Sequence, residues 1–137
     1  MNIFFDTDYT WLGLDDSVRP GTREVMERLI QDGHKIYVWS GVGIRWRDLE
    51  RHGLTELITD CFVKPLDNFI EAIDDLRLPV IPDIVLDDFP EVPSGLSGIW
   101  IRPYFYYNPT DTEMERIYQL ISSCTGWRPG RTGGESR

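Results

Sequence analysis

The stretch Asn2-Ile3-Phe4-Phe5-Asp6-Thr7-Asp8 places an apolar run directly before a pair of acidic residues. Three further apolar runs also end at polar residues, which are Ser40, Lys64 and the acidic pair Asp87-Asp88. Short apolar runs bounded in this way are typical of buried parallel strands. Because ligands bind at the carboxyl ends of the strands in open α/β sheets, we expect the four clusters to meet in one crevice.

The segments between the apolar runs predict helices that alternate with strands. The expected strands occupy residues 2–5, 35–39, 61–63, 84–86 and 98–101. The expected helices occupy residues 20–33, 43–52 and 67–76, and a last helix begins at Thr110. Alternation of this kind predicts a mostly parallel sheet covered on both faces. We therefore expect an α/β fold, a three-layer Rossmann-like sandwich around a five-stranded sheet.

The expected helix boundaries rest on residues that commonly begin or end helices. Pro20 is expected at the first position of its helix, and Gly33 just after its end. Thr110 and Glu113 have the spacing of a capping box. Residues 9–19, between the first strand and the first helix, are expected to form a small hairpin or flap.

Length and composition bound the class of protein. The 137 residues predict one domain over residues 1–125 and a flexible tail over residues 126–137, where Gly, Arg, Pro and Ser dominate. The sequence shows neither a membrane-length apolar run nor a basic leader, so we expect a cytoplasmic protein without a membrane partner. The net charge of −9 disfavours nucleic acid as a partner. Cys61 and Cys124 are expected to be small buried residues, because their spacing fits no metal site.

Asp6 and Asp8 stand two positions apart at the end of the first strand. Alternate residues of a strand point the same way, so both carboxylates can face one site. One carboxylate can attack phosphorus, while the other protonates the leaving oxygen and then deprotonates water. Asp6 and Asp87 can supply the carboxylates that Mg²⁺ prefers, and Asp88 can add a ligand or hold a water. These residues favour phosphoryl transfer with Mg²⁺ as the cofactor.

Ser40 and Lys64 have the chemistry of phosphoryl-binding residues. The Ser40 hydroxyl can donate to a phosphoryl oxygen, and Gly41 is expected to lead into the next helix, whose free N–H groups favour anions. Lys64 can neutralise the transferring group and hold the carboxylate nucleophile. The two residues thus extend the expected site across the second and third strands.

Three further side chains are candidates for binding the rest of a substrate. Tyr9 and Trp11 lie beside the expected nucleophile, and Arg45 follows Ser40. Aromatic rings and Arg side chains can form a rim that stacks on a substrate and binds its phosphate. The alternative, in which these side chains serve helix packing and loop anchoring, stays open.

Taken together, the clusters resemble the motifs of the haloacid dehalogenase (HAD) superfamily of phosphohydrolases. The first motif of that family is a hydrophobic run followed by DxDx(T/V), the second is a strand ending in Ser or Thr, the third is a Lys and the fourth is an acidic pair. The matching stretches are Phe4-Phe5-Asp6-Thr7-Asp8-Tyr9-Thr10, Tyr37-Val38-Trp39-Ser40, Lys64-Pro65 and Val85-Leu86-Asp87-Asp88. The resemblance covers residues 1–103 and implies a HAD-like fold.

The resemblance also implies a role for each matching residue. Asp6 would be the nucleophile and Asp8 the general acid and base, which points to a phosphatase rather than a dehalogenase. Asp6, the backbone carbonyl of Asp8 and Asp87 would hold Mg²⁺. Ser40 and Lys64 would bind the phosphoryl group.

Two features bear on the type of HAD-like protein. Tyr9 stands where many members have Gly, and an aromatic residue there is similar to the magnesium-dependent phosphatase branch. The chain between Asp8 and Lys64 has no room for a cap domain in addition to the expected helices and strands. The site is therefore expected to be open to a phosphorylated substrate as large as a macromolecule, while a partner subunit could cover it for a small substrate.

These expectations amount to a Mg²⁺-dependent phosphomonoester phosphatase that works through an aspartyl phosphate. A non-catalytic module that binds phosphate or a partner on the same fold is the main alternative. A signalling receiver domain is a further alternative, but its acidic pair comes first along the chain, whereas Asp87-Asp88 follows Lys64 here. The natural substrate and the oligomeric state stay open.

Overall fold

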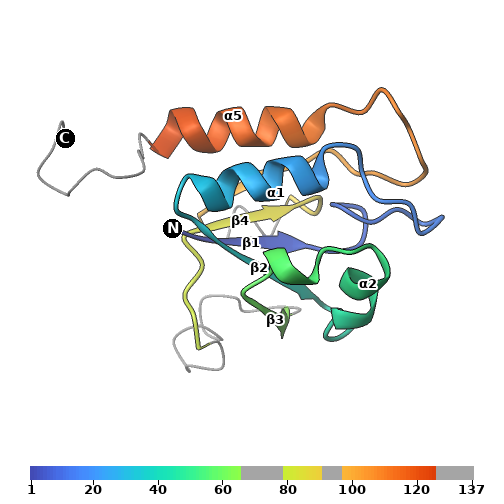
Figure 1. Ribbon diagram of the computed structural model, residues 1–137, viewed down its shortest axis with the longest axis horizontal. Coiled ribbons are helices and arrows are strands. Elements are labelled where there is room, and N and C mark those ends of the chain that lie inside the picture. Colours follow the sequence, from blue (N-terminus) through green and yellow to red (C-terminus); the bar gives the residue numbers. More distant parts are fainter. Residues whose placement is uncertain (66–78, 91–96, 126–137) are drawn as a thin grey trace, which may run out of the picture.

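The chain folds around a five-stranded, entirely parallel sheet (Figure 1). The computed structural model describes residues 1–65, 79–90 and 97–125. The strands are β1 (Asn2–Asp6), β2 (Lys35–Ser40), β3 (Asp60–Val63), β4 (Ile84–Asp87) and β5 (Gly98–Trp100). The helices are α1 (Thr22–Gln31), α2 (Trp46–Arg51), the 3₁₀ turn η1 (Thr55–Leu57) and α5 (Glu113–Thr125). The α/β class and the five strands are confirmed, each within two residues of its predicted bounds.

The strand order is β3-β2-β1-β4-β5. From β1 the chain adds β2 and β3 on one side and then β4 and β5 on the other, so the direction of winding reverses between β1 and β4. This order corresponds to that of doubly wound dinucleotide-binding sheets, in which such a reversal opens a crevice at the carboxyl ends of the strands. In this sheet the reversal lies between β1 and β4, so a crevice of this kind is expected beside the ends of these two strands.

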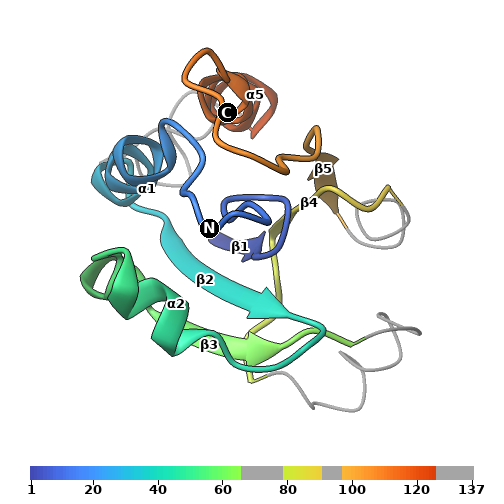
Figure 2. The same ribbon diagram turned by 90° about the vertical axis from the view of Figure 1, so that its right-hand side faces the viewer.

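The described helices cover one face of the sheet. Figure 2 shows α1, α2 and α5 on the same side of the strands. Alternate strand residues, among them Ile3, Phe5 and Val38, join Leu29 of α1 and Ile117 of α5 in one buried core. The expected helix over residues 67–76 lies outside the described residues, so the predicted three-layer arrangement is described for this face alone.

The opposite face of the sheet is built from aromatic side chains. Phe4, Tyr37 and Trp39 are buried there together with Val85, and Phe62 packs against them. The ring centroid of Phe4 lies 4.9 Å from those of both Tyr37 and Trp39. Neighbouring residues such as Phe4 and Phe5 thus fill separate cores, as strand alternation requires.

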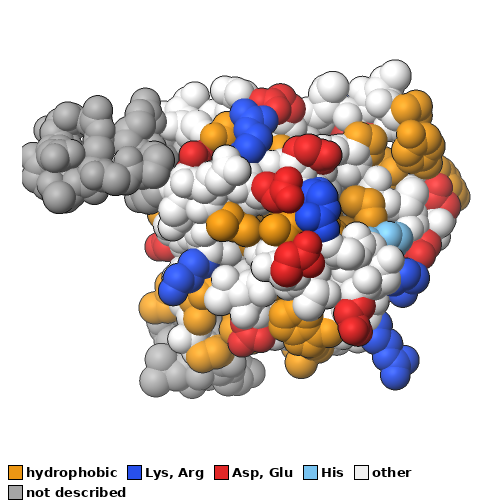
Figure 3. Space-filling model, in the orientation of Figure 1, with side chains coloured by type: hydrophobic (Ala, Val, Ile, Leu, Met, Phe, Trp, Pro, Cys, Tyr) orange, Lys and Arg blue, Asp and Glu red, His pale blue; other side chains and the backbone are white. Residues whose placement is uncertain are grey.

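The surface formed by α1 and α5 carries both signs of charge. Acidic and basic side chains are interspersed over these helices (Figure 3), and Arg28 of α1 pairs with Glu115 of α5 at 2.6 Å. No helix within the described ranges combines the length and the apolar character needed to cross a membrane. Cys61 is buried as expected, while the side chain of Cys124 and the tail over 126–137 lie outside what is described.

The first helix begins later than predicted. Pro20 and Gly21 precede α1, which starts at Thr22. The carbonyl of Arg19 accepts hydrogen bonds from both the backbone N–H and the hydroxyl of Thr22, at 3.2 and 2.8 Å. This turn, with Gly21 at φ = +85°, places Pro20 ahead of the helix. Gly33, at φ = +95°, follows the helix as predicted.

The last helix also starts later, at Glu113 rather than Thr110. The predicted capping box does not form, because Asp111 Oδ1 accepts the backbone N–H of Glu113 at 3.1 Å in place of the Thr110 hydroxyl. The Glu113 carboxylate turns instead to the backbone N–H of Arg102 at 2.9 Å and to two nitrogens of Arg116, each at 2.7 Å. Chiefly through the Arg116 hydrogen bonds, the pKa of Glu113 falls to about 2.

Acid is therefore expected to weaken the fold through Glu113. A carboxyl whose pKa is lower in the folded chain stabilises the fold above its unfolded pKa of 4.5, and this contribution fades as the pH falls towards 2. Glu113→Gln is expected to lower the free energy of unfolding by about 1–3 kcal/mol at neutral pH. The gap between the two proteins is expected to shrink in acid. Urea unfolding of both proteins at pH 7 and at about pH 3 measures it, and an undiminished gap in acid would contradict this role.

Candidate functional site

The polar residues at the ends of the strands meet at one edge of the sheet. Asp6 is the last residue of β1, Ser40 of β2 and Asp87 of β4. Lys64 follows β3, and its backbone N–H donates to the carbonyl of Ser40 at 2.9 Å. This edge forms a cleft of about 400 Å³. The residues that line the cleft are Asp6, Asp8, Tyr9, Ser40, Gly41, Val42, Lys64, Asp87, Asp88 and Phe89.

Lys64 lies between two buried carboxylates of the cleft. Its Nζ donates to Asp6 Oδ1 at 3.0 Å and to Asp87 Oδ2 at 2.9 Å. Burial alone lowers the pKa of Lys64, but the charges of Asp6 and Asp87 outweigh it and raise that pKa above its ordinary value. Lys64 therefore stays charged and holds both carboxylates in place.

The same carboxylates form an oxygen cluster that suits a divalent cation. One carboxylate oxygen each from Asp6, Asp87 and Asp88 lies within 4.8 Å of the others. Burial, and next the charge of Asp87, raise the pKa of Asp6 to about 8, although Lys64 opposes the rise. Burial likewise raises the pKa of Asp87. Three carboxyl groups of the cluster thus face the single ammonium group of Lys64, and Mg²⁺ is a cation that prefers such oxygen ligands.

Thr10 and Trp100 contact Asp88, the third acidic residue of the cluster. The Thr10 hydroxyl lies 3.3 Å from Asp6 Oδ2 and 3.4 Å from Asp88 Oδ1, so it faces both side chains. The indole N–H of Trp100 donates to the backbone carbonyl of Asp88 at 2.8 Å. Asp88 is therefore positioned by contacts from two other segments of the chain.

Asp8 lies at the rim of the cleft, on the side of β2. Two nitrogens of Arg45 donate to its carboxylate, at 2.7 and 3.0 Å. Arg45 also donates to Ser40 Oγ at 3.1 Å and to Asp48 at 2.6 Å. The guanidinium thus joins the expected acid–base residue to the expected phosphoryl-binding hydroxyl, a link that the sequence pattern did not predict.

The loop after β2 differs from the prediction of a helix over 43–52. Gly41 lies in a turn rather than at a helix N-terminus, because α2 begins only at Trp46. Gly43 adopts φ = +136°, which no α-helix contains. The backbone N–H of Val42 donates to Ser40 Oγ at 3.3 Å. The prediction that Gly41 leads directly into a helix whose free N–H groups bind an anion is therefore wrong, although Gly41 does line the cleft.

The three residues expected at the substrate rim lie in different places. Tyr9 lines the cleft, and Arg45 reaches it through Asp8 and Ser40. Trp11 is instead fully buried in the core, which corrects its expected rim position. Its backbone N–H donates to the carbonyl of Thr7, so the chain turns back after Asp8. Residues 9–19 thus form a packed hairpin-like loop, with Leu12 paired to Val18.

Arg19 is a buried residue that the sequence analysis missed. Its guanidinium forms two hydrogen bonds with Asp111, at 2.8 and 3.0 Å, and a third with the carbonyl of Thr10 at 3.0 Å. The Tyr104 ring lies 5.3 Å from the guanidinium carbon. Arg19 therefore ties the loop that carries Thr10 to the segment before α5. No local pattern marks an Arg in a polar loop as buried, because its partners come from a distant part of the chain.

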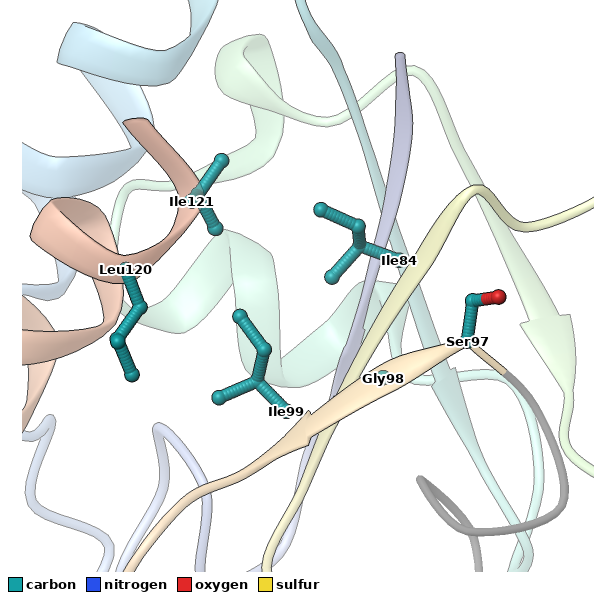
Figure 4. A pocket seen from close by; sticks show the side chains of 6 residues that line it. All are labelled: Ile84, Ser97, Gly98, Ile99, Leu120 and Ile121. Atoms are coloured by element: carbon teal, nitrogen blue, oxygen red, sulfur yellow. The ribbon is translucent and has the colours of Figure 1, made fainter. Parts of the chain in front are cut away.

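A second hollow, of about 270 Å³, lies at the opposite edge of the sheet (Figure 4). It is bounded by the first residues of β4 and β5, Ile84 and Gly98, and by Leu120 and Ile121 of α5. Ser97 contributes the polar side chain among its lining residues. None of the described residues that line this hollow is titratable, in contrast to those of the cleft at the carboxyl ends of the strands.

Comparison of the chain with protein-family models, with curated proteins and with solved structures finds no match.

The carboxylate cluster predicts a response to Mg²⁺. A cation that binds the folded chain alone stabilises it by about 2.7 kcal/mol when present at a hundred times its dissociation constant. We expect Mg²⁺ to raise the melting temperature by several degrees relative to EDTA, and Asp87→Asn to remove most of that rise.

Asp83→Asn provides the matched control, because Asp83 is an exposed residue before the start of β4, at the opposite edge of the sheet. The control is expected to keep the full response to Mg²⁺. Thermal unfolding of the three proteins with Mg²⁺ and with EDTA makes the measurement. An equal response in Asp87→Asn would show that the cation binds elsewhere.

Proposed function

We propose that the protein is a Mg²⁺-dependent phosphatase that hydrolyses phosphate monoesters through an aspartyl phosphate on Asp6. The observation that carries this proposal is the contact of Lys64 with both Asp6 and Asp87, inside a cluster that also contains Asp88. A carboxylate held by an ammonium group and flanked by cation ligands has the arrangement of a nucleophile for phosphoryl transfer.

The proposed reaction has two steps, each of which forms and breaks one bond to phosphorus. In the first, an oxygen of Asp6 forms the new P–O bond, the bond to the ester oxygen breaks, and Asp8 gives a proton to the leaving alcohol. In the second, Asp8 takes a proton from water, whose oxygen attacks phosphorus and releases Asp6 and inorganic phosphate. Lys64 and Ser40 supply positive charge and a hydroxyl donor to the phosphoryl oxygens.

Asp6, Asp87 and Asp88 would hold the Mg²⁺, together with the backbone carbonyl of Asp8 that the HAD resemblance implies. The donor set fits the cation, because it consists of oxygen atoms from three carboxyl groups, which face one ammonium group, that of Lys64. When bound, Mg²⁺ neutralises charge on the phosphoryl group and on the attacking carboxylate.

Arg45 has a part in this proposal, because its guanidinium is paired with the Asp8 carboxylate. Its guanidinium contacts Ser40 Oγ as well as Asp8, so it lies beside the expected position of the phosphoryl oxygens. Arg side chains bind phosphate through paired hydrogen bonds. A phosphoryl group at Ser40 would therefore compete with Asp8 for Arg45 and free the Asp8 carboxylate for proton transfer.

We propose further that the site is of the capless, HAD-like type. The chain between Asp8 and Ser40 forms the loop over 9–21 and α1, and that between Ser40 and Lys64 forms α2, η1 and β3. Neither stretch holds a folded insertion over the cleft. This arrangement supports access by a phosphorylated substrate, including a macromolecular one.

The strand order bears on the two alternative functions. Receiver domains have the order 2-1-3-4-5, whereas this sheet has β3-β2-β1-β4-β5, so the order disfavours a receiver. A non-catalytic module that binds phosphate remains the second candidate, and the Arg45–Asp8 ion pair favours it, because a carboxylate held in that pair is not free to transfer protons.

Asp6→Asn tests the nucleophile. Phosphate release from a panel of phosphate monoesters with Mg²⁺ is expected to fall by at least about a thousandfold, because the amide oxygen is a poor nucleophile. EDTA is expected to abolish release from the unaltered protein, while Asp83→Asn serves as the control and keeps full activity. Binding of inorganic phosphate without turnover of any ester would instead favour the non-catalytic module.

Asp8→Asn tests the general acid. Without a proton donor, a poor leaving group should suffer most, so hydrolysis of an alkyl phosphate is expected to fall by about 10²–10⁴-fold. Hydrolysis of p-nitrophenyl phosphate, whose leaving group needs no proton, is expected to fall much less. Equal losses with the two esters, measured as kcat/KM, would exclude Asp8 as the acid.

A further inference from the structure

Tyr9 has a backbone conformation that its side chain disfavours. Its φ is +65°, in the left-handed region where glycine is at ease and a bulky residue is strained. The backbone of this turn is held by hydrogen bonds from Tyr9 N–H to the Leu12 carbonyl and from Tyr104 N–H to the Tyr9 carbonyl, both 2.8 Å long. Neither bond involves the ring, so glycine would make the same turn with less strain.

Tyr9 lies at the cleft, and its ring packs against the ring of Phe105. Tyr9 is one of the residues that line the cleft with Asp6 and Asp8. Its ring centroid is 5.3 Å from that of Phe105, which is itself 47% exposed. Strained residues persist where the surroundings enforce them, and they cluster at functional sites. The strain at Tyr9 thus favours a functional role for this residue in the cleft.

Two more apolar side chains line the same cleft. Phe89 is 55% exposed and Val42 is 79% exposed, although Phe and Val side chains are usually buried in folded proteins. The backbone of Phe89 is held at the cleft, because its N–H donates to Asp87 Oδ1 at 2.9 Å. The cleft therefore combines carboxylates and the Lys64 ammonium group with two exposed apolar side chains and the half-buried Tyr9.

We infer that Tyr9 and Phe89 form a subsite for a planar aromatic ring in the alcohol part of the phosphate ester. The inference rests on the proposed function, which places the phosphoryl group at Asp6 and Ser40 in the same cleft. Aromatic rings in contact gain stabilisation beyond that of the area they bury, which a saturated group of equal size does not. The chain's net charge of −9 opposes polyanions and so favours a small monoester over a nucleic-acid strand.

Benzyl phosphate and cyclohexylmethyl phosphate form a matched pair of probes, because both release a primary alcohol and differ in the ring alone. The protein with Mg²⁺ is expected to prefer benzyl phosphate by roughly threefold to tenfold in kcat/KM. Tyr9→Gly and Phe89→Ala are each expected to bring the ratio of the two constants towards one. A nucleoside 5′-monophosphate beside ribose 5-phosphate tests whether the ring can be a heterocyclic base.

Tyr9→Gly also separates a substrate-binding ring from a structural one. Since glycine accepts a φ of +65°, the variant is expected to melt at the same temperature or higher while it loses the preference for the ring. A lower melting temperature with an unchanged preference would overturn the inference. Tyr106→Ala is the control, because Tyr106 is 65% exposed and is not a lining residue of the cleft.

Equilibrium binding of both esters to Asp6→Asn distinguishes failure of the subsite from failure of the proposed reaction. If the unaltered protein hydrolyses neither ester, the phosphatase proposal fails, and tighter binding of benzyl phosphate would still support the ring subsite. If both esters are hydrolysed and bound equally well, the subsite is excluded and the phosphatase proposal stands.

Discussion

The contact of Lys64 with Asp6 and Asp87 is the interaction on which the cleft depends. Parallel pairing of β1 with β4 places the ends of the two strands side by side and brings their two buried carboxylates together. Like charges in a poorly solvated site repel strongly, and each loses hydration as well. Lys64, delivered by the end of β3, donates to both carboxylates and offsets part of that cost. The sheet topology therefore brings the two carboxylates together, and the charge of Lys64 stabilises them there.

A second set of contacts holds this arrangement from the outside. Thr10 faces Asp6 and Asp88, and its own carbonyl accepts a hydrogen bond from the buried Arg19. Arg19 is bound in turn by Asp111, which also accepts the first N–H of α5. The start of the last helix is thus connected to the carboxylate cluster through three side chains. A displacement of α5 is therefore expected to shift the carboxylate oxygens proposed to hold the cation.

The strands and the strand-end residues were predictable from sequence, because an abrupt change from apolar to polar residues marks both. Asp6, Ser40 and Asp87 each end such a run and also end a strand. The helix starts were predicted too early, because neighbouring residues compete to cap a helix: Asp111 rather than Thr110 accepts the backbone N–H of Glu113, and Thr22 bonds to the carbonyl of Arg19 ahead of α1. The Arg45–Asp8 pair was missed for a different reason, because it joins two loops that are far apart in the sequence through side chains alone.

Tyr9 and Trp11 show what a single sequence can and cannot indicate about function. Both are aromatic residues beside Asp8 and looked equivalent, yet Trp11 is fully buried in the core and Tyr9 lines the cleft. Burial of Trp11 satisfies the ordinary preference of a large apolar side chain, although its indole N–H has no hydrogen-bond partner among the described residues. Tyr9 adopts a left-handed backbone conformation that its bulky side chain disfavours. Such conflicts between local preference and the overall fold are expected where a residue has a function other than folding. The positive φ of Tyr9 distinguishes it from Trp11. This angle could not be predicted from the sequence, because it depends on the folded conformation of the loop.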